Sequence, residues 1–92
     1  PTLLGRGTVF VDHTDACWAE AGEVIAARSE GLIRSEDVRE LGEVVLGHHQ
    51  GRSSDDEITI FKSVGIACQD AVASSLVVAA AKRLRIGTTI DI

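Results

Sequence analysis

Hydrophobic positions in the first third of the chain predict a strand followed by a helix. Residues 8–12 form a β-branched and aromatic run that ends in Asp12, a pattern typical of a buried strand. Thr14 or Asp15 can then cap a helix over residues 16–28, which Gly31 ends. Its inner face is predicted from apolar residues at helical spacing: Trp18, Ala21, Val24 and Ile25.

The middle of the chain predicts a shorter helix, an exposed loop and a second strand. Ser35 can cap the helix, two acids follow it, and Gly47 ends it. The polar residues 48–56 predict a loop, and strand-forming residues resume over 57–61. The apolar positions of the short helix recur at three- and four-residue steps: Val38, Leu41, Val44 and Val45.

The last third of the chain predicts a long apolar helix over residues 65–85. Basic residues near its end suit the negative end of the helix dipole, and Gly87 can stop it. Residues 88–92 alternate again and predict a terminal strand. One side of the helix is formed by apolar residues at four-residue steps: Val72, Leu76, Ala80 and Leu84.

Strands separated by helical segments imply an α/β fold with a parallel or mixed sheet. Two core strands cannot close such a sheet, and the last helix is too apolar to lie mostly in water. We therefore expect either further polypeptide or a second subunit to cover that helix.

Composition and charge narrow the function classes. The chain has 92 residues, enough for one small domain, and its net charge of -5 comes with no basic stripe, which argues against nucleic-acid binding. Cys17 and Cys68 lack the dense spacing of a secreted disulfide scaffold, so we expect reduced thiols in a cytoplasmic protein. The apolar stretch 64–81 is interrupted by Gln69 and Asp70 and predicts a buried helix, not a membrane span.

Two familiar site patterns are not supported by the spacing. The Gly-Arg-Gly run at residues 5–7 precedes a strand, whereas a dinucleotide-binding glycine loop follows one, so we interpret it as a turn. No paired spacing organises the residues that could bind zinc: His13, Cys17, His48, His49 and Cys68.

The sequence does not support covalent or acid–base catalysis either. Ser63 and the two cysteines lack the surroundings of a known nucleophile. The acid pairs Asp55/Asp56 and Glu20/Glu23 are predicted to be ordinary surface charges, because nothing apolar nearby would shift their pKa values.

The bend formed by Ser63, Val64 and Gly65 is a stronger candidate. It lies where a predicted strand passes into a helix N-terminus, so free backbone N–H groups are expected to face the sheet edge. Gly65 lets another group come near the backbone. A plain strand–helix turn explains the same residues, because every open α/β sheet contains several such turns.

Four stretches of the chain resemble the C-terminal part of the ornithine cyclodeaminase/mu-crystallin family. The most specific is "DEITIFKSVG", which lies within "GRSSDDEITIFKSVGIACQD". The others are "VFVDHTDACWAEAGEV", "RELGEVVLG" and the terminal "IGTTIDI".

The resemblance implies two parts. Residues 1–64 would be the C-terminal part of a Rossmann-type domain that binds NAD or NADP, and residues 65–92 would return to a dimerisation and substrate domain. Ser63, Val64 and Gly65 would border the nicotinamide ring. The family's glycine-rich loop, substrate-binding Lys and Arg and catalytic Asp match no residue here, so we expect this chain to be a piece of a longer protein, inactive alone and without a catalytic residue of its own.

The same resemblance leaves the activity open among related functions. An enzyme would act on an amino acid or cyclic imine with NAD(P), as a dehydrogenase, an imine reductase or an ornithine cyclodeaminase, which is a lyase. A mu-crystallin-like protein would bind NADPH and a ligand without catalysis. A truncated product would act only as a dimerising module. A homodimer is expected in each case.

Overall fold

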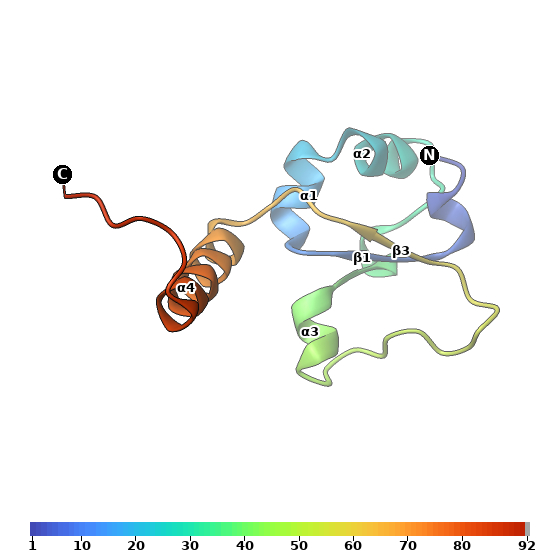
Figure 1. The fold of residues 1–92 in the computed structure, drawn as a ribbon. Coiled ribbons are helices and arrows are strands. Elements are labelled where there is room, and N and C mark those ends of the chain that lie inside the picture. The colour runs from blue at the N-terminus through green and yellow to red at the C-terminus, as the bar shows by residue number, and fades with distance from the viewer. Residues whose placement is uncertain (92) are drawn as a thin grey trace.

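The computed structural model describes residues 1–91 and contains a three-stranded parallel sheet in the order β2-β1-β3 (Figure 1). The central strand β1, Thr8–Val11, pairs with β2, Val38–Glu40, on one side and with β3, Thr59–Lys62, on the other. The α/β class and the parallel sheet predicted from the sequence are confirmed. Before residue 88 the sequence predicted two strands, whereas the sheet has three, and the additional strand is β2.

The core lies between β1 and the helices that follow it. Val9 and Val11 of β1 are fully buried, as are Cys17 and Val24 of the helices. β-branched residues favour a strand because their χ1 angles are restricted, and their burial in the central strand removes apolar surface from water. The sequence predicted this strand correctly.

The helix predicted over residues 16–28 is divided in two, α1 at Thr14–Glu20 and α2 at Gly22–Ser29. The break is at Ala21, whose ψ of 90° is extended. The Ala21 N–H donates the last hydrogen bond of α1 to the Cys17 carbonyl, and the Ala21 carbonyl accepts the first hydrogen bond of α2. Because the chain turns here, residues of both helices reach the core. The predicted inner face was therefore wrong at Ile25, which is 39% exposed.

The helix predicted to follow Ser35 is wrong over its first half. Ser35–Asp37 is a single 3-10 turn, Val38–Glu40 is strand β2, and only Leu41–Val45 is helical, as α3. Val38 pairs with Val9 of β1. Buried β1 needs partners for its backbone groups on both sides, and this demand overrides the helical spacing of the apolar residues.

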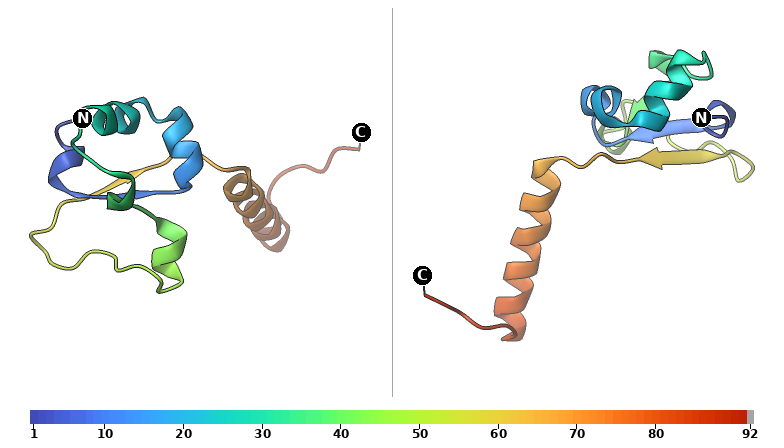
Figure 2. Two further views of the ribbon diagram at one scale, coloured as in Figure 1. Left: turned by 180° about the vertical axis from the view of Figure 1, so that it is seen from behind. Right: turned by 90° about the horizontal axis from the view of Figure 1, so that it is seen from above.

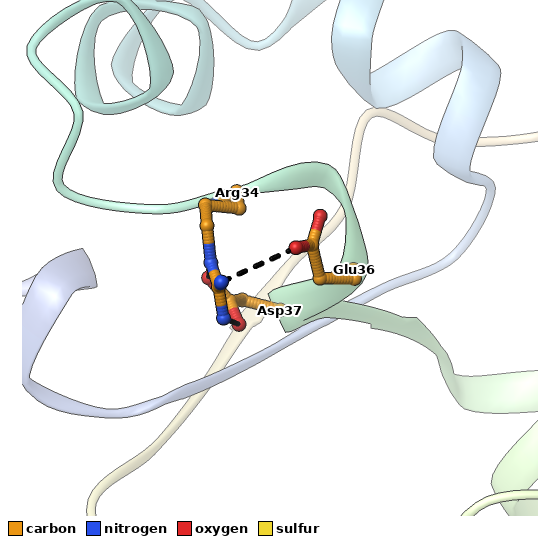
Figure 3. A network of polar contacts seen from close by, with 3 residues as sticks. All are labelled: Arg34, Glu36 and Asp37. Atoms are coloured by element: carbon orange, nitrogen blue, oxygen red, sulfur yellow. Dashed lines mark hydrogen bonds and ion pairs between the residues drawn. The ribbon is translucent and has the colours of Figure 1, made fainter.

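An exposed ionic cluster holds the turn before β2 (Figure 3). The Arg34 backbone N–H and its guanidinium both donate to Asp37, at 2.9 and 3.2 Å, and the guanidinium lies 3.4 Å from Glu36. These contacts cap the 3-10 turn and direct the chain into β2.

The predicted loop over residues 48–56 and the strand after it are confirmed, with β3 starting two residues later than predicted. Glu57 holds the loop by accepting hydrogen bonds from Thr8 Oγ1 at 2.6 Å and from Ser53 N–H at 2.5 Å. Gly7 lies directly against this segment, and a Cβ atom there would come within 2.5 Å of the Ile58 carbonyl oxygen. The Gly-Arg-Gly run is thus part of a close turn, as the sequence predicted.

Helix α4, Ala67–Leu84, leaves the sheet and projects away from it (Figure 2). None of its residues is buried by the rest of the chain. It ends at Arg85, which takes the left-handed conformation with a φ of 56°. Residues 88–91 form no strand, which corrects that prediction, and Ile92 lies outside the described residues. Several large apolar side chains of α4 are therefore more than half exposed: Val72, Leu76, Val77, Val78 and Leu84.

Candidate functional site

The carboxyl ends of the three strands meet at one edge of the sheet. Asp12 follows β1, Glu40 is the last residue of β2, and Ser63 follows β3. The connection from β1 to β2 carries α1 and α2 on one face, and the connection from β2 to β3 carries α3 on the opposite face (Figure 1). The chain thus passes from the central strand β1 to β2 on one side and then crosses the sheet to β3 on the other side. Open parallel sheets bind ligands outside the strand ends at such a point.

Asp12 joins the two strands at this point. Its Oδ2 accepts hydrogen bonds from Ser63 Oγ at 2.6 Å, from the Val64 N–H at 3.1 Å and from the Gly65 N–H at 2.8 Å. The His13 N–H donates to the other carboxylate oxygen at 3.0 Å. One carboxylate therefore holds three successive residues of the turn that follows β3.

These hydrogen bonds keep Asp12 ionised. The Ser63 hydroxyl lowers the pKa of Asp12 most, and the N–H groups of Gly65, Val64 and His13 add to it, so that the pKa falls to about 2 although burial opposes the shift. Hydrogen bonds to a carboxylate are stronger than those between neutral groups, which makes this contact a firm link between the strands.

The sequence predicted free N–H groups at this turn, and the structure corrects that prediction. The N–H groups of Val64 and Gly65 donate to Asp12 and do not face solvent unpaired. The turn therefore lacks the unpaired donors that hold a phosphate at a helix N-terminus. The sequence signal for Asp12 was its place directly after a buried strand, at the ligand-binding end of a parallel sheet.

Neighbouring contacts fix the rest of the edge. Glu40 Oε1 accepts the Thr14 N–H at 2.6 Å, which lowers the Glu40 pKa and ties β2 to the start of α1. Lys62 pairs with Glu23 of α2 at 2.7 Å on the opposite face from α3. Glu23, predicted to be an ordinary surface charge, thus links α2 to β3 and has a lowered pKa because Lys62 donates to it.

An apolar hollow of about 450 Å³ opens beside the turn. Its apolar wall includes Leu41, Val45 and Leu46 from α3 and its end, Phe61 of β3 and Ile66, and Asp12 and Gln69 add polar groups. A second hollow of about 330 Å³, lined by Phe10 and Phe61, lies under the middle of the same sheet face and away from the turn. Apolar hollows with a few polar groups are the usual shape of small-molecule sites.

Gly65 leaves the space above the turn open. It has a φ of +81°, and a Cβ atom there would meet no other atom within 4 Å. Val64 packs against the hydrophobic core and anchors the turn from the inside. The three predicted site residues are thus brought together at the edge of the sheet, with Val64 facing inward and Ser63 and Gly65 exposed.

Other candidate residues form no comparable site. Among residues 1–91, no three His, Cys, Asp or Glu side chains come together in a way that could hold a metal ion. His48 pairs with Glu43 at 2.7 Å, Cys17 is buried and Cys68 is exposed, and both cysteines are free. Over the same residues, no helix combines the length and hydrophobicity needed to cross a bilayer.

Comparison with known proteins finds one matching family model and several similar proteins. The family model described as "Ornithine cyclodeaminase/mu-crystallin family" matches residues 1–84. The chain is 36% identical over 84 residues to a Delta(1)-pyrroline-2-carboxylate reductase of Bacillus cereus, a match that covers 90% of this chain and 26% of that protein.

Two solved structures share the fold. The Thermococcus litoralis Delta(1)-pyrroline-2-carboxylate reductase, in complex with NADH and L-proline, superposes with a TM-score of 0.81 at 34% identity over 94% of this chain. The Paracoccus denitrificans iminosuccinate reductase, in complex with NAD+, superposes with a TM-score of 0.77 at 37% identity over 98% of this chain. The chain spans 27% of each of those two chains.

Proposed function

This chain belongs to the ornithine cyclodeaminase/mu-crystallin family, and we propose that it supplies the nicotinamide-side wall of an NAD(P) site in an imine reductase or amino acid dehydrogenase. Residues 1–64 would be the last part of the Rossmann-type domain, and residues 65–92 would return to the domain that shapes the substrate pocket and the dimer. Ser63, Val64 and Gly65 would line the nicotinamide.

The observation that carries this proposal is the position of the Ser63–Gly65 turn at the carboxyl ends of the paired strands β1 and β3, beside an apolar hollow. A flat, mostly apolar ring fits a wall formed by Leu41, Phe61 and Ile66. The turn does not fit the phosphates, because Asp12 takes its N–H groups and adds a negative charge. The phosphates would bind to polypeptide outside the described residues.

The chain's own residues would bind and orient the ring. Nicotinamide, when bound, supplies hydride transfer to or from a carbon atom. The open face of Gly65 allows close approach, the inward Val64 keeps the turn in place, and the apolar hollow excludes water from one side. Asp12 is not suited to act as a general acid, because its four donors hold it ionised, and its pKa of about 2 makes it a weak base.

The proposed substrates are cyclic imines or amino acids. The named substrates of the relatives support this class, since one reductase acts on pyrroline-2-carboxylate and another on iminosuccinate. A carbon–nitrogen double bond accepts a hydride on carbon and a proton on nitrogen and becomes an amine, and the reverse reaction oxidises an amino acid. The cyclodeaminase reaction, a lyase activity of the same family, is a variant of this chemistry.

We further propose a cytoplasmic homodimer, with α4 in the interface. The free cysteines suit a reducing compartment. The fully uncovered α4, with Leu76 and Val77 each 66% exposed, suits burial against other polypeptide. The same exposed helix supports the alternative of a module that only dimerises.

The proposed function is tested with the full-length protein that contains this chain. NADH and NADPH are titrated while energy transfer from tryptophan is followed, and pyrroline-2-carboxylate and iminosuccinate are then supplied while NAD(P)H absorbance is recorded. Saturable binding and substrate-dependent oxidation are expected. Binding without turnover would favour the mu-crystallin-like alternative, and no binding of either cofactor would contradict the proposal. The 92-residue chain alone is the matched control and is expected to show neither.

A further inference from the structure

Asp12 does more at this edge than a surface carboxylate ordinarily does. It stands at the end of the central strand, and its Oδ2 accepts hydrogen bonds from three successive residues of the turn after β3. Because β1 is paired on both sides and its apolar residues are buried, Asp12 is attached to the central, most buried strand of the sheet. The turn is thereby fixed to the core and not only to its own strand.

A comparable carboxylate lies at the opposite end of the sheet, at the amino ends of the strands. Glu57 accepts hydrogen bonds from the Thr8 hydroxyl at 2.6 Å and from the N–H and hydroxyl of Ser53, at 2.5 and 2.6 Å. Like Asp12, it fastens a loop to β1 and has a pKa lowered to about 2 by its donors. The two residues differ in position, since only Asp12 lies at the carboxyl ends of the strands.

We propose that Asp12 is a positioning residue for the nicotinamide ring, which it orients through the turn formed by Ser63, Val64 and Gly65. This inference rests on the proposed function. Asp12 occupies the N–H groups of Val64 and Gly65, so the turn presents its glycine face and the neighbouring apolar hollow to the ring. A turn fixed before binding loses little freedom when the ring arrives, which favours affinity and alignment.

The test uses four variants of the full-length protein. Asp12→Ala removes every acceptor that Asp12 offers the turn, whereas Asp12→Asn keeps one amide oxygen that can occupy the place of Oδ2 and accept hydrogen bonds from the turn. Glu57→Ala removes the comparable carboxylate at the opposite end of the sheet. Ser63→Ala is a milder variant to use if Asp12→Ala does not fold, because it loses the 2.6 Å contact to Asp12 and the 3.1 Å hydrogen bond from the Gly65 N–H but leaves the Asp12 carboxylate in place.

Three quantities are measured: the Kd for NADH, kcat, and the amide hydrogen-exchange rate of Gly65 in the cofactor-free protein. Asp12→Ala is expected to raise the Kd and lower kcat, each by about 10- to 100-fold, because small displacements of a bound group cost that much. Exchange at Gly65 is expected to accelerate. Asp12→Asn should stay within about 3-fold of the unaltered protein, because its amide oxygen still holds the turn, and a 3-fold change is smaller than the loss of a hydrogen bond to a charged group. Glu57→Ala should lower stability without changing any of these three quantities.

The outcomes separate the two proposals. If the unaltered protein binds neither NADH nor NADPH, the proposed function fails and this inference fails with it. If the unaltered protein binds NADH and Asp12→Ala, or Ser63→Ala in its place, binds it equally well, the positioning role alone is overturned. An equal loss of NADH affinity in Glu57→Ala would also overturn it, because the effect would then be one of general stability.

Discussion

Asp12 and Ser63 are 51 residues apart in the sequence, yet Ser63 Oγ donates to Asp12 Oδ2 at 2.6 Å. The pairing of β1 with β3 creates this contact by placing Val11 beside Lys62, one residue before each of the two partners. The contact joins the carboxyl ends of β1 and β3, on the side of β1 opposite to β2. It is the basis of both the proposed cofactor wall and the proposed role of Asp12.

Gly65→Ala is predicted to weaken cofactor binding beyond its effect on stability. A φ of +81° costs a residue with a side chain about 1–2 kcal/mol, and the new methyl group would enter the open space above the turn. Gly31→Ala is the matched control, because Gly31 has a φ of +70° and equally open surroundings away from this edge. Both variants should lose similar stability in thermal unfolding, but only Gly65→Ala should raise the Kd for NADH. Equal NADH affinity in the two would remove Gly65 from the proposed site.

Stability is predicted to decline in acid through Asp12 and Glu57. Their pKa values fall from 3.8 and 4.5 to about 2 on folding, so both stabilise the folded state when ionised. That contribution is complete above pH 4.5 and is lost as the pH falls toward 2. Denaturant unfolding measured across this range should give a shallower decline for Asp12→Asn and for Glu57→Gln than for the unaltered protein. Unchanged slopes would show that these hydrogen bonds do not persist in solution.

Gly7→Ala is predicted to destabilise the protein by about 1–3 kcal/mol, the usual cost of forcing extra volume into a packed site. The added Cβ would lie 2.5 Å from the Ile58 carbonyl, and the neighbouring Thr8 N–H donates to that same carbonyl at 2.9 Å. Gly22→Ala adds a methyl group with no atom within 4 Å, at the start of α2. It should therefore be neutral or slightly stabilising. Chemical denaturation of both variants checks the contrast, and equal stabilities would contradict the close approach at Gly7.

Leu76→Ser reports whether α4 is covered in the full-length protein. On an exposed helix this change should alter stability by no more than about 0.5 kcal/mol. Buried in an interface, loss of a leucine side chain should cost about 2–5 kcal/mol and shift the assembly toward monomer. We expect the second result, because Leu76 is 66% exposed on a helix that the rest of this chain leaves uncovered. Thermal unfolding and light scattering measure both effects, with Ala73→Ser as a small change on the same helix for comparison.

The sequence by itself determined the elements whose signals are local. The β-branched run of β1, the polar loop before β3 and the long apolar α4 were all predicted close to their observed bounds. The resemblance likewise placed the chain in its family, which the comparisons confirm. These features depend on residues that are neighbours along the chain, so periodicity and local motifs are enough to predict them.

Only the tertiary structure decided β2, the break at Ala21 and the occupied N–H groups of the turn. Val38 became a strand residue because β1 needs a second hydrogen-bonding partner, although its spacing to Leu41 is helical. Val64 and Gly65 donate to Asp12 because two strands distant in sequence end side by side. Hydrogen bonds between distant segments leave no period in the sequence, so their partners become known only when the sheet is assembled.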